Sequence, residues 1–320
     1  GLPMTVVQAD GNDVQPVTVD EFRISVAETY DVIVQPKADR AYTLFVQPED
    51  RSGYARGTLA LREGLSAPVP QLDPRVILTM ADMGHGRMDH SGHDMGAMPT
   101  MNHDMPMPMP DNTEGHEGHA GHAGHEMPST SGEHAVQTMA AAEPGGVQAH
   151  PASEVGNPLV DMQTMSPTAR LDDPGIGLRN NGRRVLTYAD LSNLFDDPDG
   201  REPGRTLELH LTGHMMRFAW SFGGIKFSDA EPVRLNYGER LRIVLVNDTM
   251  MTHPIHLHGM WSDLEDDRGA FHLRKHTVDM PPGTRRSYRV TADALGRWAY
   301  HCHLLYHMEA GMMREVRVSG

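Results

Sequence analysis

The sequence predicts an all-β protein made of Greek-key β-sandwich domains. Short runs that alternate between apolar and polar residues recur toward both ends of the 320-residue chain, and this alternation is typical of half-buried strands. Glycine, proline and aspartate separate the runs, and no stretch keeps the period of an amphipathic helix. Short strands joined by such turns are typical of antiparallel sandwiches.

Residues 1–79 form the first predicted region. Strand patterns occur there at 31–36 and at 42–47. A handful of strands leaves one face of a sheet uncovered, so we expect part of a domain rather than a whole one. We interpret the region as the closing portion of a sandwich whose opening strands lie upstream of Gly1.

Residues 80–170 form the second predicted region, a long linker rich in methionine and histidine. Methionine alternates with proline at 105–110, and histidine repeats with glycine at 115–125. Between about residues 80 and 150 there are too few large apolar side chains to offset the entropy of ordering the chain. We expect a disordered linker that interacts with metal ions, and a solvated tether without that role is the alternative.

Residues 171–320 form the third predicted region, in which strand patterns return. The clearest runs are 207–211, 241–246, 286–290 and 314–318. Turn residues separate them and no helical period is sustained, so this region is predicted to be one complete Greek-key sandwich.

Charge and cysteine content narrow the class of function. The formal net charge is −15 and the basic residues are scattered, so we expect no nucleic-acid partner. No run of about eighteen apolar residues occurs, and we expect no membrane span. Cys302 is the only cysteine, which excludes an internal disulfide and directs attention to its neighbours.

Histidines flank the single cysteine at 301–303. On a strand, successive side chains point to opposite faces. His301 and His303 then share one face, and Cys302 points to the other. One thiolate can therefore face one metal ion while its two neighbours face different ones.

A second histidine pattern begins at His253 and continues with His256 and His258. On a strand, His256 and His258 point to a common side. Any one of these histidines, taken alone, is more simply a packed or surface residue. The joint occurrence of both patterns near one end of the chain is rare, and it indicates metal binding.

Imidazole nitrogens together with a thiolate suit copper. Two histidines, one cysteine and a weak axial methionine are the pattern of a blue-copper site. Cys302, His307, Met312 and the distant His253 supply that set.

With these residues, the sequence resembles the multicopper oxidases. Their last domain carries H-P-x-H-x-H and later H-C-H-x-x-x-H-x-x-x-x-M, and the segments 253–258 and 301–312 match both motifs in full. The segments 247–260 and 50–59 further resemble the bacterial copper-resistance branch of the family. The resemblance assigns His253, Cys302, His307 and Met312 to type 1 copper, His256 to type 2 copper, and His258, His301 and His303 to type 3 copper.

The resemblance implies copper as the cofactor, a periplasmic location and cupredoxin-like domains. Residues 1–79 would be the C-terminal portion of the middle domain, and 171–320 the last domain of a three-domain enzyme. Electrons from a substrate are expected to pass from Cys302 to His301 and His303, where a trinuclear site reduces O₂ to water. The family uses eight histidines there, of which this chain has four, and no other His-x-His pair occurs in it. The type 1 site is thus expected to be complete and the type 2 and type 3 sites half complete, with the remaining ligands in N-terminal domains upstream.

Three functions remain open. Soft thioethers favour Cu(I), so the methionine-rich linker favours a cuprous oxidase in copper tolerance. A laccase-like oxidase of phenols and a non-catalytic copper-sequestering protein are the alternatives. By resemblance to cuprous oxidases, Met251 is a candidate binding residue for Cu(I). In those oxidases an acidic residue accompanies this methionine. Thr249 stands at the corresponding position here, so the adjacent Asp248 is the candidate instead.

The other histidines and the tryptophans of the last region are expected to be structural. Surface or hydrogen-bonded positions are predicted for His210, His214, His272 and His276. Core positions are predicted for Trp220, Trp261 and Trp298.

Overall fold

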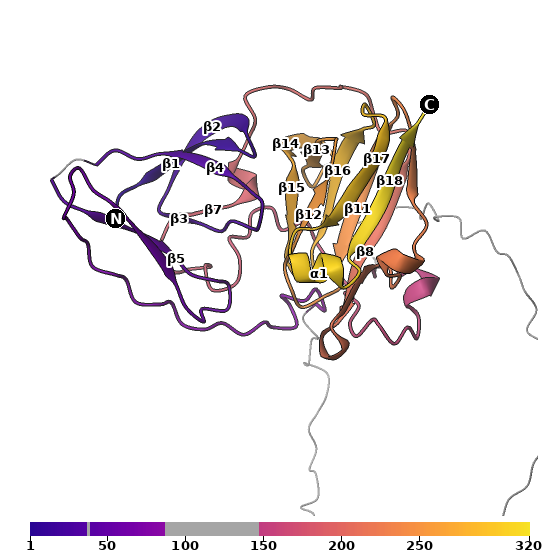
Figure 1. Cartoon of the computed structure of the whole chain (residues 1–320), viewed down its shortest axis with the longest axis horizontal. Helices are drawn as coiled ribbons and strands as arrows, with labels where there is room; N and C mark the ends of the chain where they lie inside the picture. Colours follow the sequence, from indigo (N-terminus) through magenta and orange to yellow (C-terminus); the bar gives the residue numbers. More distant parts are fainter. Residues whose placement is uncertain (37–38, 87–146) are drawn as a thin grey trace, which may run out of the picture. The chain divides into compact units, whose positions relative to one another are not determined.

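The structure is a computed structural model that describes residues 1–36, 39–86 and 147–320 (Figure 1). Nearly all the regular structure in these residues is β-strand, which confirms the predicted fold class. Most of the predicted linker, residues 87–146, lies outside the described residues. Within the described ranges, no helix combines the length and the apolar character needed to cross a membrane.

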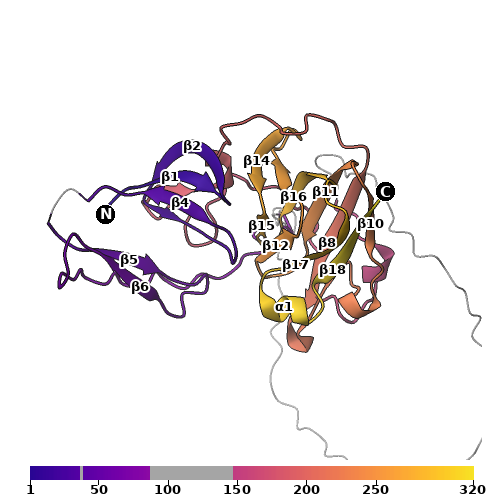
Figure 2. The same ribbon diagram turned by 45° about the horizontal axis from the view of Figure 1, so that its top comes forward.

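The first region contains short strands, most of them in two small sheets, while the strand at residues 21–22 pairs with residues 185–186 of the last region. Their bounds are Met4–Ala9 for β1, Asn12–Val19 for β2, Glu21–Phe22 for β3, Tyr30–Ile33 for β4, Tyr42–Val46 for β5 and Ala55–Leu59 for β6. One antiparallel sheet has the order β2-β1-β4, and β5 pairs with β6 (Figure 2). The strands predicted at 31–36 and 42–47 correspond to β4 and β5.

A tight hairpin joins β1 to β2. Ala9 pairs with Asn12, so Asp10 and Gly11 are the two turn residues. Their φ angles are 48° and 73°. Positive φ at both central residues is the geometry of a type I′ turn, which suits an Asp-Gly pair and matches the twist of the strands that it connects.

The last region contains two larger sheets and a short α-helix. The strand bounds are Val185–Leu186 for β7, Thr206–His214 for β8, Ala219–Phe222 for β9, Val233–Asn236 for β10, Arg240–Asn247 for β11, His253–Leu257 for β12, Ser262–Glu265 for β13, Phe271–Lys275 for β14, Thr277–Met280 for β15, Arg285–Thr291 for β16, Gly296–Cys302 for β17 and Met313–Ser319 for β18. The helix α1 spans Leu305–Glu309, and 3₁₀ turns occur at Ala152–Glu154, Tyr188–Asp190, Met215–Arg217 and Phe227–Asp229. The predicted runs at 207–211, 241–246, 286–290 and 314–318 correspond to β8, β11, β16 and β18.

The two larger sheets have the strand orders β10-β18-β17-β12-β15 and β14-β13-β16-β11-β8-β9. Parallel pairs of β10 with β18 and of β8 with β11 occur among antiparallel ones. Apolar side chains from both sheets form the core, including Leu207, Leu211, Leu241, Leu245, Ile255, Leu257, Leu264, Val290, Tyr300 and Val316. Burial of these side chains supplies the main force that holds the sheets in place.

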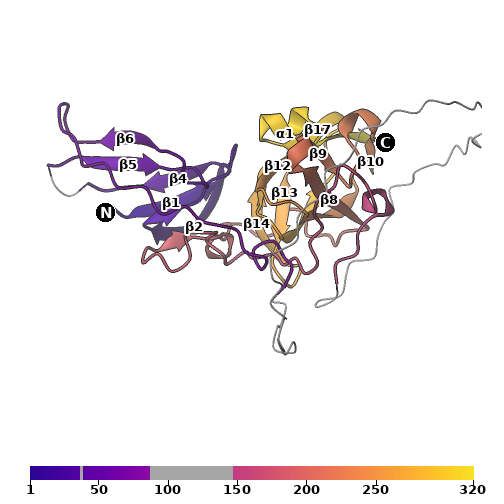
Figure 3. The same cartoon turned by 90° about the horizontal axis from the view of Figure 1, so that it is seen from below.

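The pairing of β12 with β17 brings the two histidine patterns together. Ile255 lies opposite Cys302, and His256 lies opposite His301. Directly opposed residues of an antiparallel pair project to the same face. The two positions therefore project to opposite faces of one strand pair. Figure 3 shows β9, β12, β17 and α1 close together.

Both ends of the predicted linker are part of the described structure. The backbone N–H of Met165 donates to the carbonyl of Gly84 at 3.2 Å, and the N–H of Asp161 donates to the carbonyl of Gly213 at 3.0 Å. Thr164 is fully buried. Parts of residues 80–86 and 147–170 therefore pack with the folded regions.

Buried ion pairs connect the first region to the last. Lys275 at the end of β14 has no exposed surface, and its Nζ lies 3.1 Å from Asp10 Oδ2 and 3.1 Å from Glu28 Oε1. Arg23 pairs with Asp279 at 2.9 Å. Lys275 thus meets two carboxylates and Arg23 meets one, and contact with opposite charges allows these groups to be buried.

Candidate metal centre

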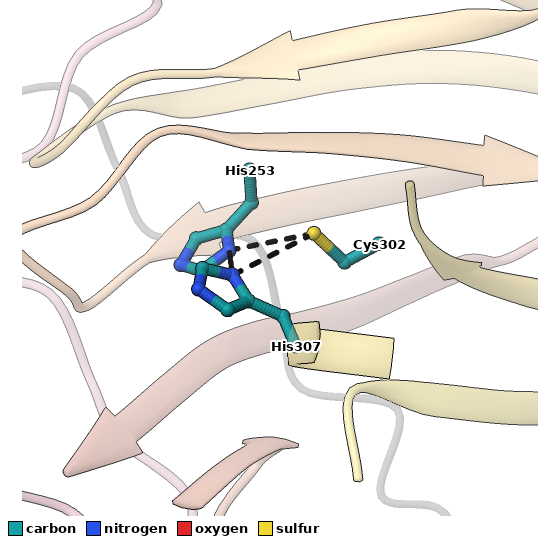
Figure 4. A group of neighbouring side chains, drawn as sticks. All are labelled: His253, Cys302 and His307. Atoms are coloured by element: carbon teal, nitrogen blue, oxygen red, sulfur yellow. Dashed lines mark hydrogen bonds between the residues drawn. The ribbon is translucent and has the colours of Figure 1, made fainter. Parts of the chain in front are cut away.

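His253, Cys302 and His307 converge in the last region, as the sequence predicts (Figure 4). His253 begins β12, Cys302 ends β17 and His307 lies in α1. The sulfur of Cys302 is 3.6 Å from Nδ1 of His253 and 3.9 Å from Nδ1 of His307, and the two nitrogens are 3.1 Å apart. All three side chains are buried.

The protonation of these groups suits a metal ion. Burial raises the pKa of Cys302 to about 12 and lowers the pKa of His307 to about 4. Burial and the neighbouring His307 lower the pKa of His253 well below its usual range. Neutral imidazoles thus present lone pairs to the thiol, and a cation would stabilise the thiolate. This donor set fits copper.

Hydrogen bonds orient His253. Its Nε2 lies 2.7 Å from Oγ1 of Thr249, which donates its own hydrogen to Oδ1 of Asn247 at 2.9 Å. The hydroxyl oxygen therefore accepts from Nε2 of His253, which leaves the Nδ1 lone pair directed toward Cys302. Fixing the outer nitrogen in this way is a usual device for a metal-binding histidine.

Met312 lies beside the same group. It is fully buried, its N–H donates to the carbonyl of His307 at 2.9 Å, and its carbonyl accepts from the N–H of Cys302 at 3.1 Å. These two backbone bonds hold Met312 next to His307 and Cys302.

The ring of Trp220, a residue that was predicted only to lie in the core, covers this site. Trp220 in β9 stacks on His307 with ring centroids 4.0 Å apart, and its centroid is 5.3 Å from that of His253. Trp220 is buried as predicted, and Trp298 packs partly buried against the core. The prediction for Trp261 was wrong, because 42% of its surface is exposed and its ring lies beside Arg274. Nothing in the sequence distinguishes Trp220 from the other two.

Four further histidines gather nearby. Nε2 of His258 lies 3.0 Å from Nε2 of His301. The ring centroid of His256 lies 4.6 Å from that of His258 and 5.7 Å from that of His303, and the centroids of His301 and His303 are 5.2 Å apart. The structure thus brings together all four histidines that the sequence assigned to the type 2 and type 3 sites.

The outer nitrogens of two of these four histidines are also fixed. Nδ1 of His256 donates to the carbonyl of His276 at 2.5 Å, and Nδ1 of His301 donates to the carbonyl of Cys302 at 3.0 Å. Their Nε2 atoms are then free to bind metal. Burial lowers the pKa of His256 to about 4, which keeps it neutral.

Asp248 and Met251 have different surroundings. Asp248 is fully buried, and Oδ1 accepts from the N–H of Thr164 at 2.7 Å, while Oδ2 lies 2.7 Å from Nδ1 of His210. Met251 is partly buried against the core. A shared role of Asp248 and Met251 in binding Cu(I) stays a prediction.

The other histidines make hydrogen bonds, as expected. His272 Nε2 donates to the carbonyl of Tyr188 at 2.8 Å, His214 accepts from the N–H of Arg217 at 3.3 Å, and His276 contacts the hydroxyl of Thr277 at 2.9 Å.

Comparison with known proteins places these features in context. Residues 201–320 and residues 1–64 each match a family model described as multicopper oxidase. Copper resistance protein A of Escherichia coli is 67% identical over 99% of this chain and 52% of that protein. Copper resistance protein A of Pseudomonas syringae is 65% identical over 99% of this chain and 52% of that protein. The chain therefore spans about half the length of these relatives.

A more distant relative and one solved structure are also described as multicopper oxidases. The multicopper oxidase MmcO of Mycobacterium tuberculosis is 37% identical over 40% of this chain and 25% of that protein. The crystal structure of Fet3p, described as a multicopper oxidase that functions in iron import, matches 99% of this chain and 52% of that one. Its TM-score is 0.55 at 16% identity, which is a likeness of fold alone.

Proposed function

Because this chain belongs to the multicopper oxidase family, we propose that it carries a complete type 1 copper site and four ligands of an oxygen-reducing trinuclear site. His253, Cys302, His307 and Met312 are the proposed type 1 ligands. His256 is proposed for type 2 copper, and His258, His301 and His303 for type 3 copper.

The observation that carries this proposal is the position of Cys302 between two groups of histidines. Its sulfur faces His253 and His307, while its chain neighbours His301 and His303 belong to the other cluster. The peptide bonds on either side of Cys302 therefore form a short covalent path between the two sites.

Copper bound at these residues would supply one-electron redox chemistry for the oxidation of a substrate and the four-electron reduction of O₂ to water. The residues of the chain set the conditions. Burial keeps water away from Cys302, the Thr249 hydroxyl holds His253, and Trp220 covers His307. A rigid, buried donor set needs little rearrangement when its metal changes charge.

Four histidines make up half of the trinuclear set in this family. We propose that the other half comes from protein outside these 320 residues, in N-terminal domains of the same enzyme. The relatives named copper resistance protein A support this, since they are about twice as long as the part that they share with this chain.

For the substrate we propose Cu(I), in periplasmic copper tolerance. The names of the two most similar relatives above and the methionine-rich composition of residues 80–150 support this choice, because thioethers prefer the cuprous ion. Met251 and Asp248 remain the candidate residues for binding it. In the completed enzyme, deleting 87–146 should slow oxidation of Cu(I) at low copper and spare phenol oxidation. Equal loss of both activities would contradict a role of this segment in supplying Cu(I).

The chain itself allows a direct test of the copper assignment. The copper-loaded chain should show the visible absorption of a copper–thiolate bond and lose it on reduction, yet it should not sustain O₂ consumption in an oxygen electrode. Adding the N-terminal domains should restore consumption. Absence of the absorption would refute the type 1 site, and sustained consumption by the chain alone would refute the half-cluster.

A further inference from the structure

A second group of metal-binding side chains lies apart from the type 1 group. His150 precedes the first 3₁₀ turn, Glu154 ends that turn, His210 lies in β8 and Asp248 follows β11. One donor atom from each of the four can be chosen so that all lie within 4.8 Å of one another. The proposed copper chemistry uses none of them except Asp248, as a candidate.

The spacing of the donor atoms is that of ligands around one ion. His150 Nδ1 is 3.1 Å from Glu154 Oε2 and 3.5 Å from Asp248 Oδ2, and His210 Nδ1 is 3.6 Å from Glu154 Oε1. Ligands about 2.0–2.2 Å from a tetrahedral ion lie about 3.3–3.6 Å apart. Two pairs are closer than this, His150 Nδ1 and Glu154 Oε2 at 3.1 Å and His210 Nδ1 and Asp248 Oδ2 at 2.7 Å, and they would have to separate around an ion.

The outer nitrogens of both histidines are already fixed. Nε2 of His150 lies 2.9 Å from the carbonyl oxygen of Thr164, and Nε2 of His210 lies 3.2 Å from a carboxylate oxygen of Glu208. Because both partners only accept hydrogen bonds, each Nε2 carries a hydrogen. In neutral imidazoles both Nδ1 lone pairs then face the carboxylates. Histidine ligands of metal ions are usually held in this way.

One carboxylate oxygen has no hydrogen-bond partner. Oε2 of Glu154 accepts from Nε2 of Gln163 at 3.0 Å, but Oε1 is buried without one, and the side chain has no exposed surface. An unpartnered buried oxygen is costly. It faces Nδ1 of His210, where a bound cation would satisfy it.

The negative charge of the group also has to be balanced. The side chains of Asp248 and Glu154 are both fully buried. The charge of the nearby Glu208 is balanced by Arg285, 3.1 Å away. With neutral histidines, the first two carboxylates leave two negative charges inside the protein. Buried charge of this kind is stable only when it is balanced.

We propose that His150, Glu154, His210 and Asp248 bind one divalent transition-metal ion of the zinc or cupric class. Imidazole nitrogen and carboxylate oxygen suit Zn²⁺ and Cu²⁺, and the absence of sulfur among these four residues disfavours Cu(I). The site is distinct from the type 1 group and does not depend on its copper.

Two protonated histidines are the competing way to balance the charge. Burial opposes their charge, but hydrogen bonds with Asp248 outweigh it and raise the pKa of His150 to about 10 and that of His210 to about 9. The same negative field attracts a proton or a metal ion. The test therefore has to detect the ion itself.

The number of zinc ions that each chain retains after equilibration shows whether the group binds metal. The whole chain carrying Cys302→Ser, which removes the type 1 thiolate, is incubated with Zn²⁺ and dialysed against a weak chelator. Glu154→Gln and Asp248→Asn in that background should each retain one zinc ion fewer per chain. His214→Gln is the control, since His214 lies on the same strand as His210 and outside the group. Zinc bound to residues 87–146 is common to all variants and cancels in the difference.

Equal zinc content in the control and in both variants would overturn the proposal and leave an ion-pair network of protonated histidines. Near-ultraviolet circular dichroism shows which variants keep the fold. Anomalous scattering at the zinc edge, from a crystal of the zinc-loaded chain without substitutions at these residues, decides the matter independently of folding. A peak between Nδ1 of His150 and Nδ1 of His210 is expected, and zinc bound only elsewhere would refute the site.

Discussion

The sulfur of Cys302 lies 3.6 Å from Nδ1 of His253, although 49 positions separate them in the chain. The register of two strands explains this. Ile255 is opposite Cys302, and His253 is two residues before Ile255, so all three project to one face of the β12–β17 pair. His256 and His301 are opposite each other and project to the other face. Two metal sites can thus share one pair of strands.

Replacing Cys302 by serine should abolish the visible copper–thiolate absorption, because Cys302 supplies the only negatively charged sulfur among the proposed ligands. His301→Ala should leave most of the absorption, since His301 belongs to the other cluster. Visible spectra of the two copper-loaded variants provide the check. Equal loss in both would contradict the division of the ligands between two sites.

Trp220 should matter for both stability and the type 1 site. Truncating a buried tryptophan typically costs about 3–5 kcal/mol, so Trp220→Ala should lower the free energy of unfolding by that order. Trp220→Phe keeps an aromatic ring over His307 and should cost less while changing the reduction potential of the copper. Urea unfolding and a redox titration measure the two effects. Trp261→Phe is the control, because its ring is partly exposed, and an equal effect there would contradict the role given to Trp220.

The metal-free chain should be most stable near pH 6.5. Burial lowers the pKa of His307 and of His256 to about 4, so between pH 6.5 and 4 the unfolded chain binds protons that the folded chain does not, and stability falls. The pKa values of His150 and His210 are raised to about 10 and about 9, so their contribution is complete below pH 6.5 and is lost as the pH rises toward those values.

Urea midpoints of the chelator-treated protein between pH 4 and pH 10 test this dependence. His210→Gln should flatten the alkaline side without changing the acid side. A midpoint that keeps rising from pH 7 to pH 9 in the unsubstituted chain would show that protonated histidines do not stabilise the fold.

Lys275→Met should destabilise the chain strongly. The substitution leaves Asp10 and Glu28 buried beside an uncharged side chain, and breaking a buried pair in this way costs about 3–5 kcal/mol. Lys226→Met is the matched control, since Lys226 makes no ion pair within the described residues. Urea unfolding compares the two. A cost below that of the control would mean that the ion pairs contribute nothing to joining the regions.

The strands, and the face to which each motif residue points, could be predicted from the sequence for a physical reason. Strand alternation is local, and His256, His258, His301 and Cys302 lie within short motifs whose spacing already assigns each side chain to a face. The convergence of these motifs came from the resemblance to a family, because pairing between β12 and β17 depends on contacts that no local pattern contains.

Other features could not be predicted for the same reason. Trp220 reaches His307 from a different strand, and composition alone cannot distinguish it from Trp261. The second histidine and carboxylate group joins His150 to Asp248 across most of a domain, and no motif links them. Residues 147–170 were assigned to the linker although part of that segment packs with the sandwich, because Thr164 is buried through tertiary contacts.

The register of β12 and β17 also constrains how this protein can change over generations. A substitution can alter one ligand at a time, but an insertion of a single residue within either strand would turn every following side chain to the opposite face. Cys302 would then face away from His253, and His301 away from His256, in one step. Both groups of side chains would be displaced together, so the length of these strands is less free to vary than their composition.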